Sequence, residues 1–206
     1  MKQTDLSRLP IILLAAGQSS RMRGRDKLLE QIDGKPLLRD RAETARAATS
    51  GPVIVALPPA PHPRYATLEG CDVTPCPIPD AALGMSASLK GALAALPQDC
   101  PAVMVLLADL PELTAEDLRC VFAAMDQDRT AVIWRGTTQE GAPGHPIVFA
   151  NPLFADLSRL SGDTGGQEVV RQHRDRTVPV PLPGRRARRD LDTPEDWAAW
   201  RATRQP

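Results

Sequence analysis

The segment Leu14–Lys27 carries the residue types that hold a polyphosphate. It follows a short apolar run and contains, in order, Gly17, Ser19, Ser20, Arg21, Gly24 and Lys27. Glycine lets a backbone approach an anion closely, and serine hydroxyls add hydrogen-bond donors. Arginine presents a planar fork to phosphate oxygens, and lysine presents a point charge. The order of residues therefore predicts a phosphate-binding loop, with an ordinary Gly/Ser turn as the alternative.

This loop matches neither of two common phosphate-binding motifs. G-x-x-x-x-G-K-[ST] is absent from it, and so is G-x-G-x-x-G with its downstream acid. A redox enzyme of the Rossmann kind is therefore excluded.

Two carboxylates are candidates for a metal site. Asp109 directly follows the apolar run Ala102–Ala108, so it is expected at the tip of a central strand. Magnesium prefers one or two carboxylates together with phosphate oxygens and water. Asp192 is the predicted second carboxylate, with Asp190 as a further candidate in the same extended segment. The alternatives are that Asp109 caps a turn and that Asp192 or Thr193 caps the last helix.

Three further segments carry candidate binding residues. The stretch Gly84–Ser88 opens a predicted helix, whose free backbone donors suit a base edge or an anion. Met85 within it has core packing as its alternative. His145 precedes a predicted strand and is a candidate contact for the acceptor, whereas His173, among arginines, is expected on the surface. Asp163 lies in a turn before a helical stretch, where turn chemistry is the alternative.

The elements that must position these residues alternate along the chain. Unbroken apolar runs predict buried strands at 10–16, 52–57 and 102–107, and weaker runs predict strands at 130–134, 146–149 and 177–180. Pro179 restricts the last of these to a sheet edge. Helical spacing or capping signals predict helices at 37–48, 86–96 and 114–125 and one opening at 193. This alternation predicts an α/β fold: a Rossmann-like three-layer α/β/α sandwich around a mostly parallel sheet.

Composition excludes several other classes of protein. Lys and Arg number 25 against 25 Asp and Glu, and only seven residues are aromatic, so a nucleic-acid partner is not expected. No apolar run reaches the length of a membrane helix, and the N-terminus has no signal-peptide pattern, so no membrane partner is expected either. Four cysteines without metal-ligand spacing indicate free thiols and a cytoplasmic location. The basic run Arg185–Arg189 predicts a solvated loop, with a phosphate-side contact as the alternative.

The chain also resembles a known family. Leu14-Ala-Ala-Gly17-x-Ser19-x-Arg21-Met22 followed by Lys27-Leu-Leu resembles the signature loop of the MobA-like NTP transferases, and more narrowly that of the MocA-like cytidylyltransferase branch. The similarity continues through Gly34-Lys-Pro-Leu37, Gly84-Met-Ser-Ala-Ser88-Leu, Leu107-Ala-Asp109-Leu-Pro111, Gly144-His-Pro146, Leu160-Ser-Gly-Asp163-x-Gly165 and Asp190-Leu-Asp192-Thr-Pro-Glu-Asp196. It covers almost the whole chain. Two positions depart from the family pattern: Arg23 stands where glycine is usual, and His145 stands where asparagine is more common.

The resemblance implies a Mg²⁺-dependent transfer of CMP from CTP to the phosphate of a molybdopterin-type cofactor, with release of pyrophosphate; Mn²⁺ is the alternative metal. It implies catalytic roles for Arg21, Lys27 and Asp109 and metal ligation by Asp109 and Asp192. It implies nucleotide binding by Leu14, Ala15, Ala16, Gly17, Ser19, Arg21, Lys27, Gly84, Met85, Ser86 and Ser88, and acceptor binding by His145 and Asp163.

The apolar Leu14-Ala-Ala stretch favours a pyrimidine, since guanylyl-transferring relatives tend to have extra glycines there. A single domain spanning 1–206 is expected, with a nucleotide-binding half at about 8–111 and an acceptor-binding half at about 112–206. A molybdenum hydroxylase or its chaperone is the expected recipient. Two alternatives remain: an NTP transferase for another phosphorylated acceptor (GTP- or sugar-phosphate-using), and a non-catalytic module that delivers a cofactor.

Overall fold

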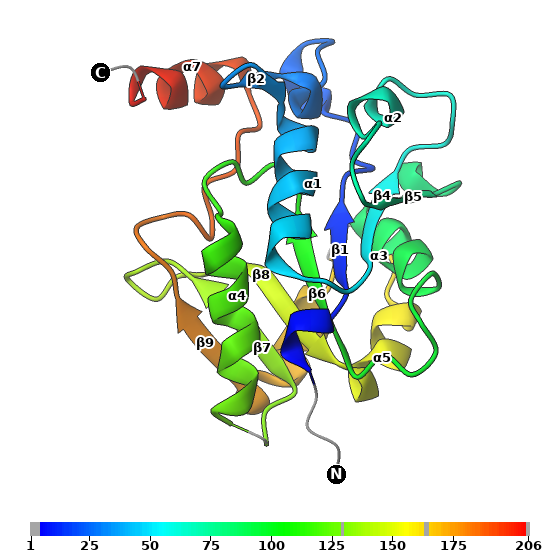
Figure 1. Cartoon of the computed structure of the whole chain (residues 1–206), viewed down its shortest axis with the longest axis vertical. Helices are drawn as coiled ribbons and strands as arrows, with labels where there is room; N and C mark the ends of the chain where they lie inside the picture. The colour runs from blue at the N-terminus through cyan, green and yellow to red at the C-terminus, as the bar shows by residue number, and fades with distance from the viewer. Residues whose placement is uncertain (1–4, 129, 163–164, 205–206) are drawn as a thin grey trace.

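A seven-stranded sheet forms the centre of the computed structural model, which describes residues 5–128, 130–162 and 165–204 (Figure 1). Its order is β5-β4-β1-β6-β8-β7-β9. The strands are β1 (Ile11–Leu14), β4 (Val53–Leu57), β5 (Thr74–Pro77), β6 (Ala102–Leu107), β7 (Ile133–Thr137), β8 (Pro143–Ala150) and β9 (Thr177–Pro181). A separate small hairpin pairs β2 (Gln31–Ile32) with β3 (Lys35–Pro36).

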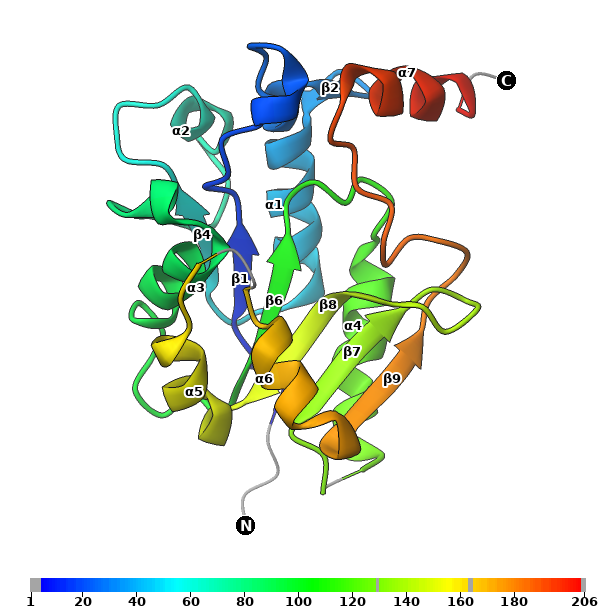
Figure 2. The ribbon, with the colours of Figure 1, turned by 180° about the vertical axis from the view of Figure 1, so that it is seen from behind.

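Helices cover both faces of this sheet. Figure 1 shows α1 (Leu37–Ala48) and α4 (Ala115–Ala123) on one face. Figure 2 shows α3 (Met85–Leu93), α5 (Phe154–Arg159) and α6 (Gln167–Gln172) on the other face. The short α2 (Arg64–Thr67) and the terminal α7 (Pro194–Ala202) lie near the end of the sheet to which β1 and β6 point. The predicted three-layer α/β/α architecture is therefore confirmed.

The two cores follow from the alternation of side chains along the strands. In β1, Ile11 and Leu13 belong to the core under α1 and α4, whereas Ile12 and Leu14 belong to the core under α3, α5 and α6. All four side chains are buried. A strand buried on both faces needs an unbroken apolar run, which is why the sequence predicted the central strands well.

Two strands differ from the sequence-based expectation. β8 runs antiparallel to both β6 and β7, so the sheet is mostly but not wholly parallel. β5 lies in a proline-rich stretch that reads as a loop, yet it pairs with β4 in parallel register. Its prolines are tolerated because β5 is an edge of the sheet, as is β9, where Pro179 required an edge.

Helix boundaries agree closely with the capping signals. Thr114 and Asp117 form a reciprocal capping box at the start of α4, and Thr193 and Asp196 form another at the start of α7. α3 ends at Leu93, three residues before the predicted end.

The neighbouring β1 and β6 create the crevice in which a ligand can bind. From β1 the chain crosses to β4 on one side, and it later returns to β6 on the other side. The connections that leave the two strands therefore run in opposite directions along the sheet, and open α/β sheets bind ligands at such a point. Leu14, the first residue of the phosphate-loop candidate, pairs with Leu107, which lies two residues before Asp109. Within the described ranges, none of the helices has the length and apolar character needed to cross a bilayer.

Candidate active site

Lys27 lies between two carboxylates at the crevice. Its Nζ donates to Asp109 Oδ2 at 2.5 Å and to Asp192 Oδ1 at 2.6 Å. Arg21 contacts the other oxygen of Asp192, with 2.6 Å between Nη2 and Oδ2. Burial acts to lower the pKa of the Lys27 ammonium, but the two carboxylates outweigh it and raise that pKa above its ordinary value. Three distant segments thus meet in one compact charged cluster.

Local structure explains how each member reaches this cluster. Asp26 accepts a hydrogen bond from the Leu28 backbone N–H at 3.0 Å, and this caps the short 3₁₀ helix that begins at Lys27. Asp109 lies two residues after the end of β6. Asp192 precedes α7, whose capping is done by Thr193 and Asp196. The Asp192 carboxylate is therefore free to face Lys27.

The acid pair in the last extended segment is electrostatically uneven. Burial acts to raise the pKa of Asp192, but the hydrogen bond from Lys27 outweighs it and lowers that pKa. Burial raises the pKa of Asp190, and the nearby charges of Asp192 and Asp109 raise it further. Asp192 is thus held as the carboxylate of the cluster, and Asp190 protonates more readily.

Arg64 is a residue that the sequence analysis missed. It is only 1% exposed. Its guanidinium makes a two-point contact with Asp26, at 2.7 Å from Nε to Oδ2 and 2.7 Å from Nη2 to Oδ1, and Nη1 donates to the Ala15 carbonyl at 2.5 Å. These bonds outweigh the effect of burial and lower the pKa of Asp26. Arg64 therefore fixes both ends of the loop that carries Lys27.

A cavity of about 590 Å³ opens beside the charged cluster. Among the predicted site residues, those that line it are Leu14, Ala15, Ala16, Gly17, Arg21, Lys27, Gly84, Met85, Ser88, Asp109 and Asp192. Gln18, Ser20 and Asp190 also line it. Gly84 has a φ of +108° at the start of α3, a conformation that favours glycine.

Two predicted nucleotide-binding residues do not line this cavity. The Ser19 hydroxyl accepts from the Lys27 backbone N–H at 3.2 Å and donates to Asp26 at 3.2 Å. Ser19 is therefore occupied within the loop. Ser86 is buried at 1% exposure, and its backbone N–H donates to Gly162 at 3.1 Å. Both serines were assigned by their place in a motif, which does not fix side-chain direction, and their role in nucleotide binding stays a prediction.

A second, smaller cavity of about 250 Å³ adjoins the first. His145, at the start of β8, lines it, and Nδ1 of its ring lies 3.4 Å from the Val105 carbonyl. Burial lowers the pKa of His145 to about 4, and the nearby Arg135 charge also acts to lower it. The ring is therefore neutral near pH 7. Asp163, the other predicted acceptor contact, lies outside the described residues.

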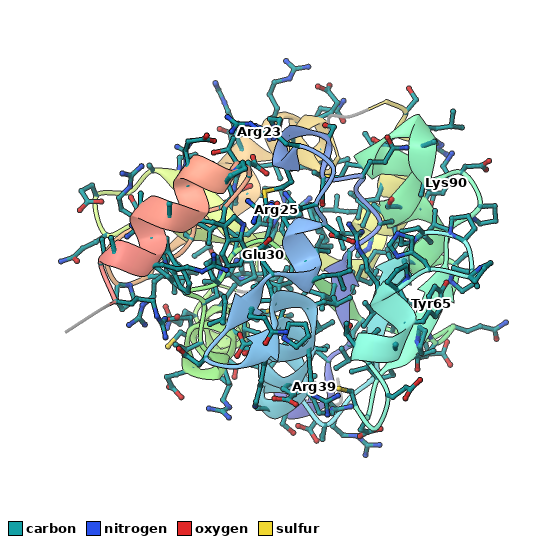
Figure 3. All side chains as sticks on the ribbon, turned by 90° about the horizontal axis from the view of Figure 1, so that it is seen from above. Arg23, Arg25, Glu30, Arg39, Tyr65 and Lys90 are labelled. Atoms are coloured by element: carbon teal, nitrogen blue, oxygen red, sulfur yellow. The ribbon has the colours of Figure 1, made fainter. Side chains whose placement is uncertain are left out.

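The loop between Gly17 and Gly24 also contacts α7. Arg23 has a φ of +54°, and its guanidinium lies 2.6 Å from Glu195 of α7. Arg201 of α7 contacts Glu30 at 2.8 Å. Figure 3, seen from above, shows Arg23, Arg25 and Glu30 along the segment beside α7. The arginine that departs from the family pattern thus links the loop to the last helix.

A family model for the MobA-like NTP transferase domain matches residues 11–177. The chain belongs to the MobA-like NTP transferase family. It is therefore a nucleotidyltransferase-family domain, and the predicted resemblance is confirmed at this level.

Curated relatives match the chain in sequence over much of its length. The bifunctional protein GlmU of Leifsonia xyli subsp. xyli is 37% identical over 173 residues, which is 82% of this chain and 33% of GlmU. The chain spans about a third of the length of the curated relatives it matches.

Solved structures extend the comparison. Rv0371c of Mycobacterium tuberculosis H37Rv superimposes with a TM-score of 0.79 at 26% identity, covering 94% of this chain and 97% of Rv0371c. A structure of Rv0371c in complex with manganese has a TM-score of 0.76 at 24% identity, with 93% and 97% covered. CMP:2-keto-3-deoxy-manno-octonic acid synthetase complexed with CTP has a TM-score of 0.72 at 15% identity, with 95% and 98% covered, which shows the fold alone.

The residues of this MobA-like site fit a divalent metal. Oδ1 of Asp109 is buried and has no hydrogen-bond partner among the described residues, so one carboxylate oxygen is available to a cation. Asp192 lies on the other side of Lys27 Nζ. In the described ranges no three His, Cys, Asp or Glu side chains group as a metal cage. Two carboxylates with room for phosphate oxygens suit Mg²⁺ or Mn²⁺ bound together with a nucleotide.

Proposed function

We propose that this chain transfers CMP from CTP to the phosphate of a molybdopterin-type cofactor and releases pyrophosphate. An oxygen of the acceptor phosphate attacks the α-phosphorus of the triphosphate. The bond from that phosphorus to the oxygen bridging to the β-phosphate breaks, and pyrophosphate leaves with the electron pair. The chemistry requires alignment and charge neutralisation, and no covalent enzyme intermediate.

The observation that carries this proposal is the charged cluster of Lys27, Asp109, Asp192 and Arg21 at the carboxyl ends of β1 and β6. A triphosphate in the larger cavity meets Lys27 and Arg21, whose positive charges then exchange carboxylate partners for phosphate oxygens. The released carboxylates are the groups that hold a divalent cation. Mg²⁺, or Mn²⁺, supplies charge neutralisation on the triphosphate when it is bound there.

The assignment of CTP rests on the apolar and backbone groups that line the larger cavity. Leu14, Ala15 and Ala16 line the larger cavity with apolar side chains at the end of β1, and Gly84 and Ser88 line it from the start of α3. Backbone donors at this helix start suit the polar edge of a base. The resemblance to the MocA-like branch favours the smaller pyrimidine base.

The acceptor assignment rests on the division of the chain at the crevice. We assign residues of about 8–111 to nucleotide binding and residues of about 112–206 to acceptor binding. His145 and Asp163 belong to the second half. A neutral His145 ring provides hydrogen bonds to an acceptor without attracting its phosphate. A molybdenum hydroxylase, or its chaperone, is the recipient we expect for the product.

Pyrophosphate release tests the proposal directly. CTP, GTP and ATP are supplied separately, with Mg²⁺ and a molybdopterin-type acceptor, and we expect release with CTP alone. Release with GTP alone would refute the base assignment. CTP binding with no release would refute this acceptor and favour another phosphorylated acceptor or a cofactor-delivery module.

Calorimetry on two lysine variants tests the phosphate site itself. Lys27→Ala is expected to weaken CTP binding by about tenfold or more, because a charged hydrogen-bond donor to phosphate is lost. Lys90→Ala is the matched control: it removes the same charge from an exposed position on α3 (Figure 3). Equal affinity of the Lys27→Ala variant and the parent would refute the role of Lys27.

A further inference from the structure

The basic run Arg185–Arg189 is divided by its contacts into two kinds of arginine. Arg186 contacts Asp117 at 3.3 Å, and Arg189 contacts Glu112 at 3.3 Å. These two side chains attach the run to α4 and to the loop before it. Arg188 instead lines the smaller cavity. The run is therefore not a uniformly solvated loop.

The backbone contact between this run and β8 fixes where Arg188 lies. The His145 N–H donates to the Ala187 carbonyl at 2.8 Å. A Cβ on Gly144 would lie 2.1 Å from that same carbonyl oxygen, so only glycine permits this approach. The Gly144-His145 pair therefore anchors the run at the residue directly before Arg188.

A second arginine reaches the same cavity from the sheet. Arg135 is a half-buried residue of β7, and its Nε donates to the Gly144 carbonyl at 2.9 Å. That bond fixes the guanidinium plane, and the two terminal nitrogens make no hydrogen bond within the described residues. Burial lowers the pKa of Arg135, and the nearby charge of Arg188 lowers it further. Two guanidinium groups thus lie close enough to repel each other.

No carboxylate neutralises this pair. Within residues 5–128, 130–162 and 165–204, neither Arg135 nor Arg188 has an ion-pair partner. Asp190 lines the cavity but forms no ion pair with either of them. His145 is neutral and adds no negative charge. Its Nδ1 faces the Val105 carbonyl, which only accepts, so Nδ1 carries the proton and Nε2 is left as a hydrogen-bond acceptor.

We propose that Arg135 and Arg188 form an oxyanion subsite that binds an acidic group of the acceptor, a phosphate or a carboxylate. The apolar part of the acceptor packs on the neighbouring side chains, which are Leu89, Val105, Ile147 and Phe149. Paired guanidinium groups suit both oxyanions, because each binds two oxygens at once. The subsite rests on the proposed function in one respect: it makes the smaller cavity the acceptor site of a nucleotidyl transfer.

The test uses two probes with the same ring, phenyl phosphate and benzoate, titrated into the parent chain and its variants by calorimetry. Arg188→Gln and Arg135→Gln are each expected to weaken binding of the preferred probe by about tenfold or more. Arg185→Gln is the matched control, because it removes the same charge from an exposed residue of the same run that does not line the cavity. Thermal melting of each variant checks that Arg135→Gln folds, and the exposed Arg188 supplies a variant that does not disturb the core.

Each result of these titrations either supports the proposed subsite or contradicts it. Preference for phenyl phosphate assigns a phosphate group, and preference for benzoate assigns a carboxylate. Unchanged binding in both cavity variants overturns the subsite, as does equal weakening by Arg185→Gln. Weakening by Lys27→Ala and not by Arg188→Gln also overturns it, since the probe then binds in the nucleotide cavity.

A parallel CTP titration separates the two proposals. Arg188→Gln is expected to change CTP affinity less than about twofold, because the residue does not line the larger cavity. If CTP fails to bind the parent while phenyl phosphate binds in an Arg188-dependent way, the proposed function fails and the subsite stands.

Discussion

The two adjoining cavities share a wall but arrange their charges differently. Leu14, Met85, Leu107 and Asp190 line both. In the larger cavity Lys27 and Arg21 are paired with carboxylates of the chain itself. In the smaller cavity Arg135 and Arg188 have no such partner in the part of the chain that the structure describes. In the larger cavity the carboxylates of the chain balance the positive charges, whereas the smaller cavity has an excess of positive charge.

This difference separates two ways of binding an anion. A self-neutralised cluster holds its geometry before the ligand arrives, and the ligand must exchange with internal partners. An unneutralised pair attracts an anion from solution, and salt screens that attraction. We therefore expect acceptor binding to weaken with ionic strength more than nucleotide binding does.

The largest expected effect is a loss of turnover when the charged cluster of the larger cavity is broken at Asp109. Asp109→Asn keeps the side-chain volume but removes the charge that faces Lys27 and that we propose binds the metal. A metal contribution of several kcal/mol corresponds to a loss of about 10³-fold in turnover. Pyrophosphate release measures it, and Asp99→Asn, an exposed acid before β6, is the control. A folded Asp109→Asn protein with parental activity would refute the metal assignment.

The next effect concerns the Arg64 clamp, which consists of the contacts of Arg64 with Asp26 and with the Ala15 carbonyl. This clamp holds the loop that lines the larger cavity. Arg64→Met leaves Asp26 partly buried without its cation, which is expected to cost about 3–5 kcal/mol in the free energy of unfolding. Urea denaturation measures it. The double variant Arg64→Met/Asp26→Asn is expected to recover part of this loss, because no unpaired charge remains. A double variant less stable than the single one would contradict the clamp.

A smaller effect tests the neutral histidine of the second cavity. The folded chain holds the pKa of His145 at about 4, against an ordinary value of 6.5, so below pH 6.5 the unfolded chain binds a proton that the folded chain does not. The free energy of unfolding therefore falls as the pH drops from 6.5 toward 4, by at most about 3 kcal/mol from this residue. His145→Asn is expected to flatten that slope in urea denaturations across the range. An unchanged slope would show that His145 titrates normally.

The smallest effect concerns the ion pair between Arg23 and Glu195, two residues that do not line the larger cavity. Arg23→Gly relieves a left-handed residue but removes an exposed ion pair with Glu195, so the two changes offset each other. The free energy of unfolding is expected to change by less than about 1 kcal/mol. Thermal melting checks this, with Glu195→Gln as the variant that loses the ion pair alone. A loss of several kcal/mol would mean that the loop depends on this link.

The sequence predicted the parts of the site that local pattern determines. Asp109 and the Lys27 loop follow unbroken apolar runs, and the capping signals at Thr193 placed Asp192 next to a helix start. Such features depend on neighbours in the chain, so the central strands, the helix starts and most residues lining the larger cavity were foreseen.

The remaining features depend on contacts between distant segments. Arg64 follows a proline-rich loop with no motif, and only the fold brings it to Asp26. Arg135 lies in a strand, where a charged residue ordinarily faces solvent, and Arg188 belongs to a run that reads as a solvated loop. Ser19 lies in the predicted loop, but its hydroxyl bonds to Asp26 and to the Lys27 backbone N–H. For these residues the local pattern in the sequence does not determine the contacts that the fold makes.

The contacts of Lys27 also set the order in which the site is completed. Asp192 lies 165 positions beyond Lys27 in the chain, and Asp109 lies 82 positions beyond it. A ribosome delivers these partners one after the other, so the emerging lysine meets its first carboxylate long before its second. A nascent chain that has not yet extended to α7 can assemble the central sheet while its nucleotide cavity lacks one wall. The nucleotide cavity is thus completed only after the segment that carries Asp192 has been synthesised.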